Sequence, residues 1–202
     1  SDEVPITVYE TALNPEGTAY ELNPGVDGSL WLSDNEAGEI RHYSADGSSV
    51  VIYSGLGAVS DAHPTTGGIV WFVDQDQARL GRLDPDLVTA SVQYWPLPEG
   101  GDSGFGTTID QFGRIWVSDF SQPLLYRYDP GNTQQNVCVF DTSDLAGFGS
   151  PYITSDGEHL WFSSIYDNTV LRLDPEMDPL NLDYELTSWH YSDLTWDFEA
   201  ED

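Results

Sequence analysis

A tryptophan recurs at a nearly constant interval along this chain and constrains its fold more than any other feature. Trp31, Trp71, Trp116 and Trp161 are separated by 40, 45 and 45 residues. Each lies in a short apolar run, with a turn signal before it and another apolar run after it. Four short strands in each such period are typical of β-propeller blades. The repeat therefore predicts an all-β fold: a β-propeller of four-stranded antiparallel blades, with four repeats visible.

The fourth copy shows the blade pattern most clearly. Asp156-Gly157 is a hairpin turn signal, and the apolar run Leu160–Phe162 follows it. A further run, Val170–Leu173, alternates and stops at Asp174-Pro175. A lone four-stranded sheet cannot bury both of its faces, whereas radial stacking buries each face against the next blade. We therefore expect the four repeated tryptophans to act as wedges between neighbouring blades.

The repeat predicts a single propeller domain over residues 1–202. The blades are expected at the following residues: 18–54, 58–97, 105–142 and 150–191. Residues 4–12 match a fourth strand rather than a first, so they are a spare N-terminal strand, and 192–202 form an acidic tail. Three interpretations of the spare strand stay open: a piece of a longer propeller, two chains that pair into an eight-bladed ring, or terminal strands that add to a neighbour's sheet edge.

The repeat unit also resembles a known family, the streptogramin lyase-like (virginiamycin B lyase-like) propellers, and is similar to the wider NHL and gluconolactonase-like propellers. The residues that carry the resemblance are Pro151, Ile153, Asp156, Gly157, Leu160, Trp161, Phe162, Asn168, Val170, Arg172, Leu173 and Asp174. The resemblance implies a propeller of seven blades. It also implies a metal-dependent lyase with catalytic histidines and a carboxylate in one late blade. No close His-x-x-His cluster is present in this sequence.

The composition is strongly acidic and limits the classes of partner. The chain has 35 acidic and six basic residues, for a net charge of −29. Such a charge argues against binding to nucleic acid or to anionic membranes. The sequence also contains no run of 18 apolar residues of the kind that would predict membrane insertion. The charge suits an extracellular or cell-surface protein, or alternatively the cytoplasm of a halophile, where salt screens self-repulsion. The single cysteine, Cys138, lies in an apolar run and is expected to be a buried, inert thiol.

Three carboxylates recur at one position of the repeat. Asp34, Asp74 and Asp119 each follow the repeated tryptophan by three residues. Carboxylates near one mouth of the channel are suitable ligands for Ca²⁺ or Mg²⁺. The alternative is that each aspartate caps the turn that follows its strand. His63 precedes Pro64 on an innermost strand and is a further candidate for a ligand or cation site.

These observations favour a non-catalytic extracellular or surface propeller that acts as a binding or assembly module. Its expected partners are other protein subunits or a second copy of itself, through strand edges or blade faces. The abundant tyrosines and tryptophans make carbohydrate a further candidate partner. The alternative is a metal-dependent lyase- or lactonase-like enzyme with its site at the channel mouth.

Overall fold

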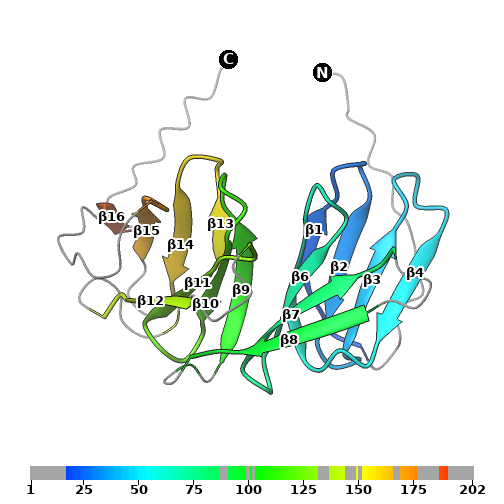
Figure 1. Cartoon of the computed structure of the whole chain (residues 1–202), viewed down its shortest axis with the longest axis horizontal. Helices are drawn as coiled ribbons and strands as arrows, with labels where there is room; N and C mark the ends of the chain where they lie inside the picture. Colours follow the sequence, from blue (N-terminus) through cyan, green and yellow to red (C-terminus); the bar gives the residue numbers. More distant parts are fainter. Residues whose placement is uncertain are drawn as a thin grey trace, which may run out of the picture.

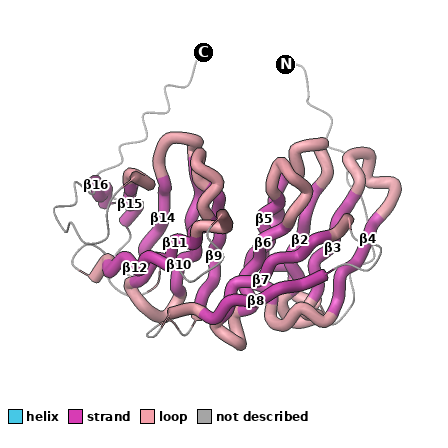
Figure 2. Tube along the Cα trace, in the orientation of Figure 1, coloured by secondary structure: helices cyan, strands magenta, loops and turns pink. Residues whose placement is uncertain are grey.

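The computed structural model describes residues 17–86, 91–98, 101, 103–131, 137–143, 149, 152–165 and 169–176, and the backbone of 187–190. These residues form strands and loops, and they contain no helix that could span a membrane (Figures 1 and 2). The predicted spare strand at 4–12 and the acidic tail at 192–202 lie outside the described residues.

The strands form four antiparallel sheets of four, each built from consecutive strands. Blade 1 contains β1 (Ala19–Pro24), β2 (Leu30–Asp34), β3 (Glu39–Tyr43) and β4 (Val50–Ser54). Blade 2 contains β5 (Val59–Pro64), β6 (Val70–Asp74), β7 (Arg79–Asp84) and β8 (Ser91–Pro96). Blade 3 contains β9 (Gly104–Ile109), β10 (Ile115–Asp119), β11 (Leu124–Tyr128) and β12 (Val137–Asp141). Blade 4 contains β13 (Ile153–Ser155), β14 (Leu160–Ser164), β15 (Thr169–Leu173) and β16 (Thr187–His190).

The first hairpin of every blade turns through a glycine with a positive φ. These glycines are Gly28, Gly68, Gly113 and Gly157, with φ values of 81°, 81°, 77° and 90°. Residues with a Cβ avoid this region of backbone conformation, so glycine permits the tight turn. The turn signals that mark the repeat in the sequence therefore fix the hairpin that places each tryptophan on the second strand.

The blades pack face to face, with a tryptophan at each interface, as the repeat predicts. Trp31 of blade 1 packs in one apolar cluster with Val70 and Phe72 of blade 2. Trp71 lies in the next cluster with residues of blade 3, and Trp116 lies in the third with residues of blade 4. All three side chains are buried. The hydrophobic core is thus three consecutive layers between four blades.

Three of the repeated tryptophans contact a histidine or arginine side chain on the neighbouring strand. Trp31 stacks on His42, with the ring centroids 3.9 Å apart. The guanidinium of Arg127 lies 5.6 Å from the ring of Trp116, and that of Arg172 lies 5.9 Å from Trp161. Such pairs on one face of a sheet stabilise the blade. Cys138 is only partly buried, with Arg127 Nη2 at 3.3 Å from its Sγ, because it lies on the outermost strand of blade 3.

The first strands of the four blades lie next to one another. β1 contacts β5, β5 contacts β9, and β9 contacts β13. They are therefore the inner strands that surround the central channel, and the fourth strands lie outermost. Figure 1 shows blades 1 and 2 on one side of the molecule and blades 3 and 4 on the other.

Candidate functional site

The three recurring aspartates are buried at the ends of β2, β6 and β10, and each is hydrogen-bonded within its own blade. Asp34 Oδ1 accepts hydrogen bonds from the backbone N–H groups of Thr18 and Ala37, at 2.9 and 3.1 Å. Asp34 Oδ2 accepts one from Arg41 Nη2 at 3.1 Å, and Arg41 is itself buried. Asp34 therefore ties the turn after β2 to the segment that enters β1.

Asp74 and Asp119 repeat this arrangement with different partners. Asp74 accepts hydrogen bonds from Ala58 N–H at 3.1 Å and from Arg79 Nε at 2.7 Å. Asp119 accepts hydrogen bonds from two backbone N–H groups in the turn after β10 and from the Tyr126 hydroxyl at 3.1 Å. The contacts of all three aspartates are those expected of residues that cap turns.

The structure does not assemble these aspartates into one site. Within the described ranges, no group of three or more histidine, cysteine, aspartate or glutamate side chains is placed to hold a metal ion. Metal binding by Asp34, Asp74 and Asp119 stays a prediction.

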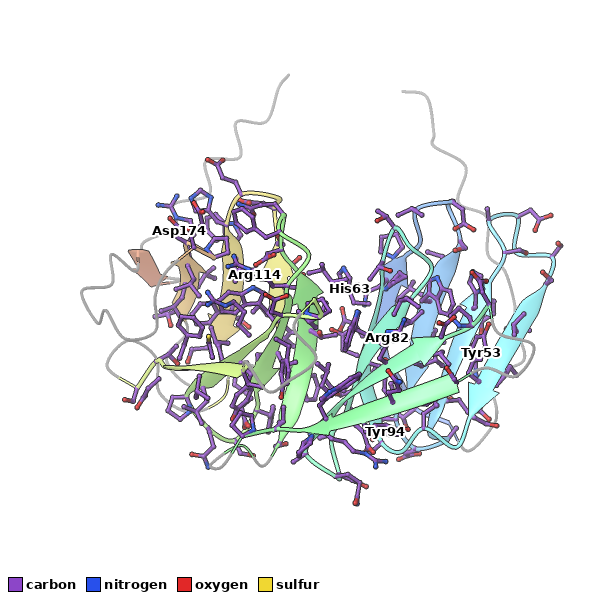
Figure 3. The ribbon with its side chains drawn as sticks, in the orientation of Figure 1. Tyr53, His63, Arg82, Tyr94, Arg114 and Asp174 are labelled. Carbon is purple, nitrogen blue, oxygen red and sulfur yellow. The ribbon has the colours of Figure 1, made fainter. Side chains whose placement is uncertain are left out.

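His63 lies apart from the three aspartates and lines a pocket in the channel. This channel pocket has a volume of about 290 Å³ and is lined by residues of all four blades. The inner strands supply most of its polar groups, namely Glu21, Asn23, Asp61, His63, Thr107 and Thr154. Figure 3 shows His63 between the half of the molecule with blades 1 and 2 and the half with blades 3 and 4. A concave site with converging polar groups is the usual form of a small-molecule site.

Asp61 is the most constrained polar group of the channel pocket. Its Oδ1 accepts hydrogen bonds from Asn23 Nδ2 and from its neighbour Ala62 N–H, both at 2.7 Å. Its Oδ2 accepts one from Thr107 N–H, also at 2.7 Å. Asn23 is on β1 and Thr107 is on β9, so one carboxylate joins the inner strands of three blades.

The titratable groups of the channel pocket have perturbed proton affinities because they are withdrawn from water. Burial, together with the nearby Glu21 charge, raises the pKa of Asp61 to about 7, although its N–H donors act in the opposite direction. Burial also raises the pKa of Glu21 and lowers that of His63. Two carboxyl groups and a neutral imidazole therefore share a partly dehydrated site, a combination that is enriched at functional sites.

Among the polar residues of the channel pocket, the sequence predicts His63 as a candidate but not Glu21, Asn23, Asp61 or Thr107. The strand-end aspartates can be recognised in the sequence because they recur at one position of the repeat, whereas the channel residues differ from blade to blade. A local signal existed in Ser60-Asp61-Ala62-His63, where two titratable residues alternate on an innermost strand. The register irregularity between Val59 and Asp61 could not be predicted from the sequence.

No protein-family model and no curated protein matches this sequence. Solved structures do match its fold. One is a catalytically inactive virginiamycin B lyase from Staphylococcus aureus with quinupristin, with a TM-score of 0.75 and 21% identity over 94% of this chain and 60% of that chain. A streptogramin B lyase structure has a TM-score of 0.71 and 19% identity over 88% of this chain and 56% of that one.

A structure of a nidogen/laminin complex is also similar, with a TM-score of 0.68 and 14% identity over 87% of this chain and 65% of that chain. The present chain thus spans less than two thirds of each of these structures. At such identities the similarity shows the fold alone. The chain therefore has a β-propeller fold of the kind found in the streptogramin B lyase structures.

Proposed function

We propose that this protein is a non-catalytic binding module that holds a small organic cation in the channel pocket. The observation that carries the proposal is the lining of that pocket, where Glu21 and Asp61 converge and where no lysine or arginine is among the lining residues described. A cationic ligand offsets the cost of keeping two carboxylates in a partly dehydrated site.

Aromatic and hydroxyl groups complete a site of this kind. Tyr152 lines the pocket and about half of its side chain is exposed, so its ring is accessible to a ligand. An ammonium group over a tyrosine ring gains cation–π stabilisation, and Thr154 and Ser163 add hydroxyl groups nearby. Organic ammonium compounds are therefore a better match than nucleotides or other anions.

The direct test is a calorimetric titration of the full chain with tetramethylammonium chloride at moderate salt. We expect one binding site per chain. Glu21→Gln should raise the dissociation constant about tenfold, which corresponds to a loss of about 1.4 kcal/mol in binding free energy. The matched control is Glu158→Gln, which removes the same charge from an exposed position outside the pocket. A general acidic surface would instead give weak binding that responds equally to both substitutions.

A second candidate function is an enzyme of the lyase- or lactonase-like kind. It is favoured by Asp61, because a carboxyl group with a pKa of about 7 near His63 suits proton transfer at neutral pH. This candidate predicts turnover of a lactone substrate. The rate should fall by at least about a hundredfold in Asp61→Asn. An unchanged rate in that variant would leave only the binding function.

We also propose that the protein works outside the cell or on its surface. The acidic composition without lysine supports this location, and the cytoplasm of a halophile is the alternative. Fractionation of the source organism, with detection of this chain in the medium or the envelope, distinguishes the two.

A further inference from the structure

One residue on the third strand of each blade lies opposite the repeated tryptophan, and blade 1 departs from the repeat at this position. In blades 2, 3 and 4 the residue paired with the tryptophan is an arginine, namely Arg82, Arg127 and Arg172. In blade 1 the paired residue is His42. Blade 1 therefore lacks the guanidinium that the repeat places beside the tryptophan in the other three blades.

Arginines connect the two blades at the junction between blades 3 and 4. Arg114 Nη2 and Arg127 Nη1 of blade 3 donate hydrogen bonds to the carbonyl oxygen of Pro175 in blade 4, at 2.7 and 3.2 Å. Arg114 precedes its tryptophan by two residues, and the equivalent residue of blade 1 is Ser29. Pro175 follows its tryptophan by 14 residues, and the equivalent residue of blade 2 is Pro85. The junction between blades 1 and 2 thus keeps the proline but has neither arginine.

A pocket lies between blades 1 and 2 where these two arginines are missing. This junction pocket has a volume of about 260 Å³. Its walls include the residues at the positions just compared: Ser29, Trp31, His42 and Pro85. The corresponding hollow between blades 2 and 3 is lined by Arg82, so that junction has a guanidinium of its own. The junction pocket is therefore the place where the repeat leaves space for a guanidinium without supplying one.

The charges around the junction pocket favour a cation. Asp27, from the first hairpin of blade 1, and Asp86, which follows β7 of blade 2, bring a carboxylate from each side. Burial and the nearby Asp86 charge raise the pKa of Tyr53, so this carboxylate of blade 2 acts on the blade 1 side of the pocket. No lysine or arginine is among the lining residues described. A positively charged group in this pocket would therefore be attracted from both sides.

His42 adds an unsatisfied polar atom to the junction pocket. Its ring stacks on that of Trp31, and its Nε2 is buried without a hydrogen-bond partner in the described part of the chain. Burial lowers the pKa of His42, although the Asp27 charge acts in the opposite direction. A neutral imidazole has one nitrogen that accepts a hydrogen bond. Because a buried polar atom without a partner is costly, a ligand that donates to it would gain binding free energy.

We propose that the junction pocket binds a guanidinium group, which takes the place of the arginine that blade 1 lacks. A guanidinium is planar, has five N–H donors and no acceptor, and stacks on aromatic rings. These properties match a pocket with two carboxylates, an imidazole nitrogen and the rings of Trp31 and Tyr53. An ammonium group has the charge but not the planar set of donors, so it should bind less tightly.

Two sources can supply the guanidinium: a small guanidino compound, or an arginine side chain of a partner protein. The net charge of −29 favours both, because it raises the concentration of cations near the surface. The proposal is independent of the ligand in the channel pocket, because the described linings of the two pockets have no residue in common.

The test follows the NMR signal of the Trp31 indole N–H in the full chain, because Trp31 lines the junction pocket and not the channel pocket. The probe is N-acetyl-arginine amide, whose only charge is the guanidinium, and the matched probe is N-acetyl-lysine amide. The arginine compound should shift the signal in a saturable way, with a dissociation constant at least about threefold below that of the lysine compound. Equal affinities, or no shift up to about 10 mM, would overturn the proposal.

A substitution that restores the repeat tests whether the pocket itself is occupied. His42→Arg introduces the residue that blades 2, 3 and 4 have at this position, so the fold should tolerate it. Its guanidinium competes for the pocket, and the dissociation constant of N-acetyl-arginine amide should rise at least about tenfold. His159→Arg is the matched control, because it makes the same change at a partly exposed position outside both pockets. Equal effects of the two, or no effect of His42→Arg, would overturn the proposal.

An exposed carboxylate gives a second test that leaves the core of the blades unchanged. Asp86→Asn should raise the dissociation constant of N-acetyl-arginine amide about threefold, the effect expected of an exposed ion pair. Asp76→Asn removes the same charge from an exposed position outside the pocket and should have no effect. Equal effects would place the cation on the general acidic surface and would overturn the proposal.

A further pair of probes distinguishes the two sources of the guanidinium. Methylguanidine represents a small compound, and N-acetyl-Ala-Arg-Ala amide represents an arginine side chain within a polypeptide. Tighter binding of the peptide, by at least about threefold, would identify a partner protein as the source. Equal or tighter binding of methylguanidine would identify a small guanidino compound. Failure of both probes to shift the Trp31 signal would overturn the proposal for either source.

Discussion

At the scale of single residues, the buried carboxylates are of two kinds, which differ in their hydrogen-bond partners and in their position in the blade. Asp34 is paired with the buried Arg41 and with backbone N–H groups of its own blade. Asp61 receives hydrogen bonds from neighbouring inner strands and lies at the wall of a pocket. The first kind fixes a loop, and the second joins inner strands at the channel pocket.

Asp61 should make stability depend on pH. Its pKa is about 7 in the folded protein against an ordinary value of 3.8, so the folded state binds more protons between these values. The stabilisation from the protonated form is complete below pH 3.8 and is lost as the pH rises to about 7. The unfolding free energy of the native protein minus that of Asp61→Asn should therefore fall over this range. Chemical denaturation at several pH values measures the difference.

The ionisation of Asp61 should make the affinity for the cation depend on pH. An organic cation in the channel pocket favours the ionised carboxylate, so its dissociation constant should fall as the pH rises from about 5 to 7, by at most about tenfold per pH unit. Calorimetry in buffers of different ionisation enthalpy would detect the released proton. Affinity that does not vary over this range would mean that the cation binds away from Asp61.

Asp34 should matter for stability whether or not a metal is present. Asp34→Ala leaves Arg41 buried with Glu39 as its remaining ion-pair partner, so we expect a loss of about 3 kcal/mol in unfolding free energy. The exposed Asp76→Ala should change stability by less than about 0.5 kcal/mol. Both are measured by denaturation in EDTA and again with Ca²⁺. A loss seen only with Ca²⁺ would identify Asp34 as a metal ligand instead.

At the scale of the elements, the hairpin between the first and second strands organises each blade. Its glycine at positive φ sets the turn. In blades 3 and 4 a nearby aspartate also accepts the indole N–H of the tryptophan: Asp110 from Trp116 at 2.8 Å and Asp156 from Trp161 at 2.7 Å. These contacts hold the pKa of Asp156 down to about 2, chiefly through the His159 N–H and then the Trp161 indole.

The turn glycines should be sensitive to substitution for reasons of backbone conformation alone. A Cβ on Gly113 would meet no atom within 4 Å, but φ is 77° there. Gly113→Ala should therefore cost about 1 kcal/mol of unfolding free energy. Gly67, in the corresponding turn of blade 2, has no positive φ and open surroundings, so Gly67→Ala is the matched control and should be neutral or slightly stabilising. Equal effects of the two would contradict this account of the turn.

At the scale of the whole molecule, the blade repeat could be predicted because it is local and periodic. Turn glycines and Trp31, Trp71, Trp116 and Trp161 recur at fixed offsets, and those offsets indicate a blade directly. The channel pocket could not be predicted in this way. Its key contacts join Asn23, Asp61 and Thr107, which are more than 30 residues apart in sequence and occupy non-equivalent positions in their blades.

The exposed face of blade 1, which carries Leu30, lies between these two cases. The sequence indicates which residues form each face, because the tryptophan repeat gives the register. Only the packed structure distinguishes Leu30, which is exposed, from the equivalent Val70 and Ile115, which are buried. Exposure of an aliphatic face is therefore a property of the arc of blades, not of the repeat.

We propose the channel pocket as the binding site for an organic cation. The most direct measurement is a crystal structure of the full chain grown with tetramethylammonium at a saturating concentration. The cation should lie in the channel pocket, in contact with the carboxylates of Glu21 and Asp61 and with the ring of Tyr152. A pocket that holds water alone, with the cation only at exposed acidic residues of the surface, would contradict it.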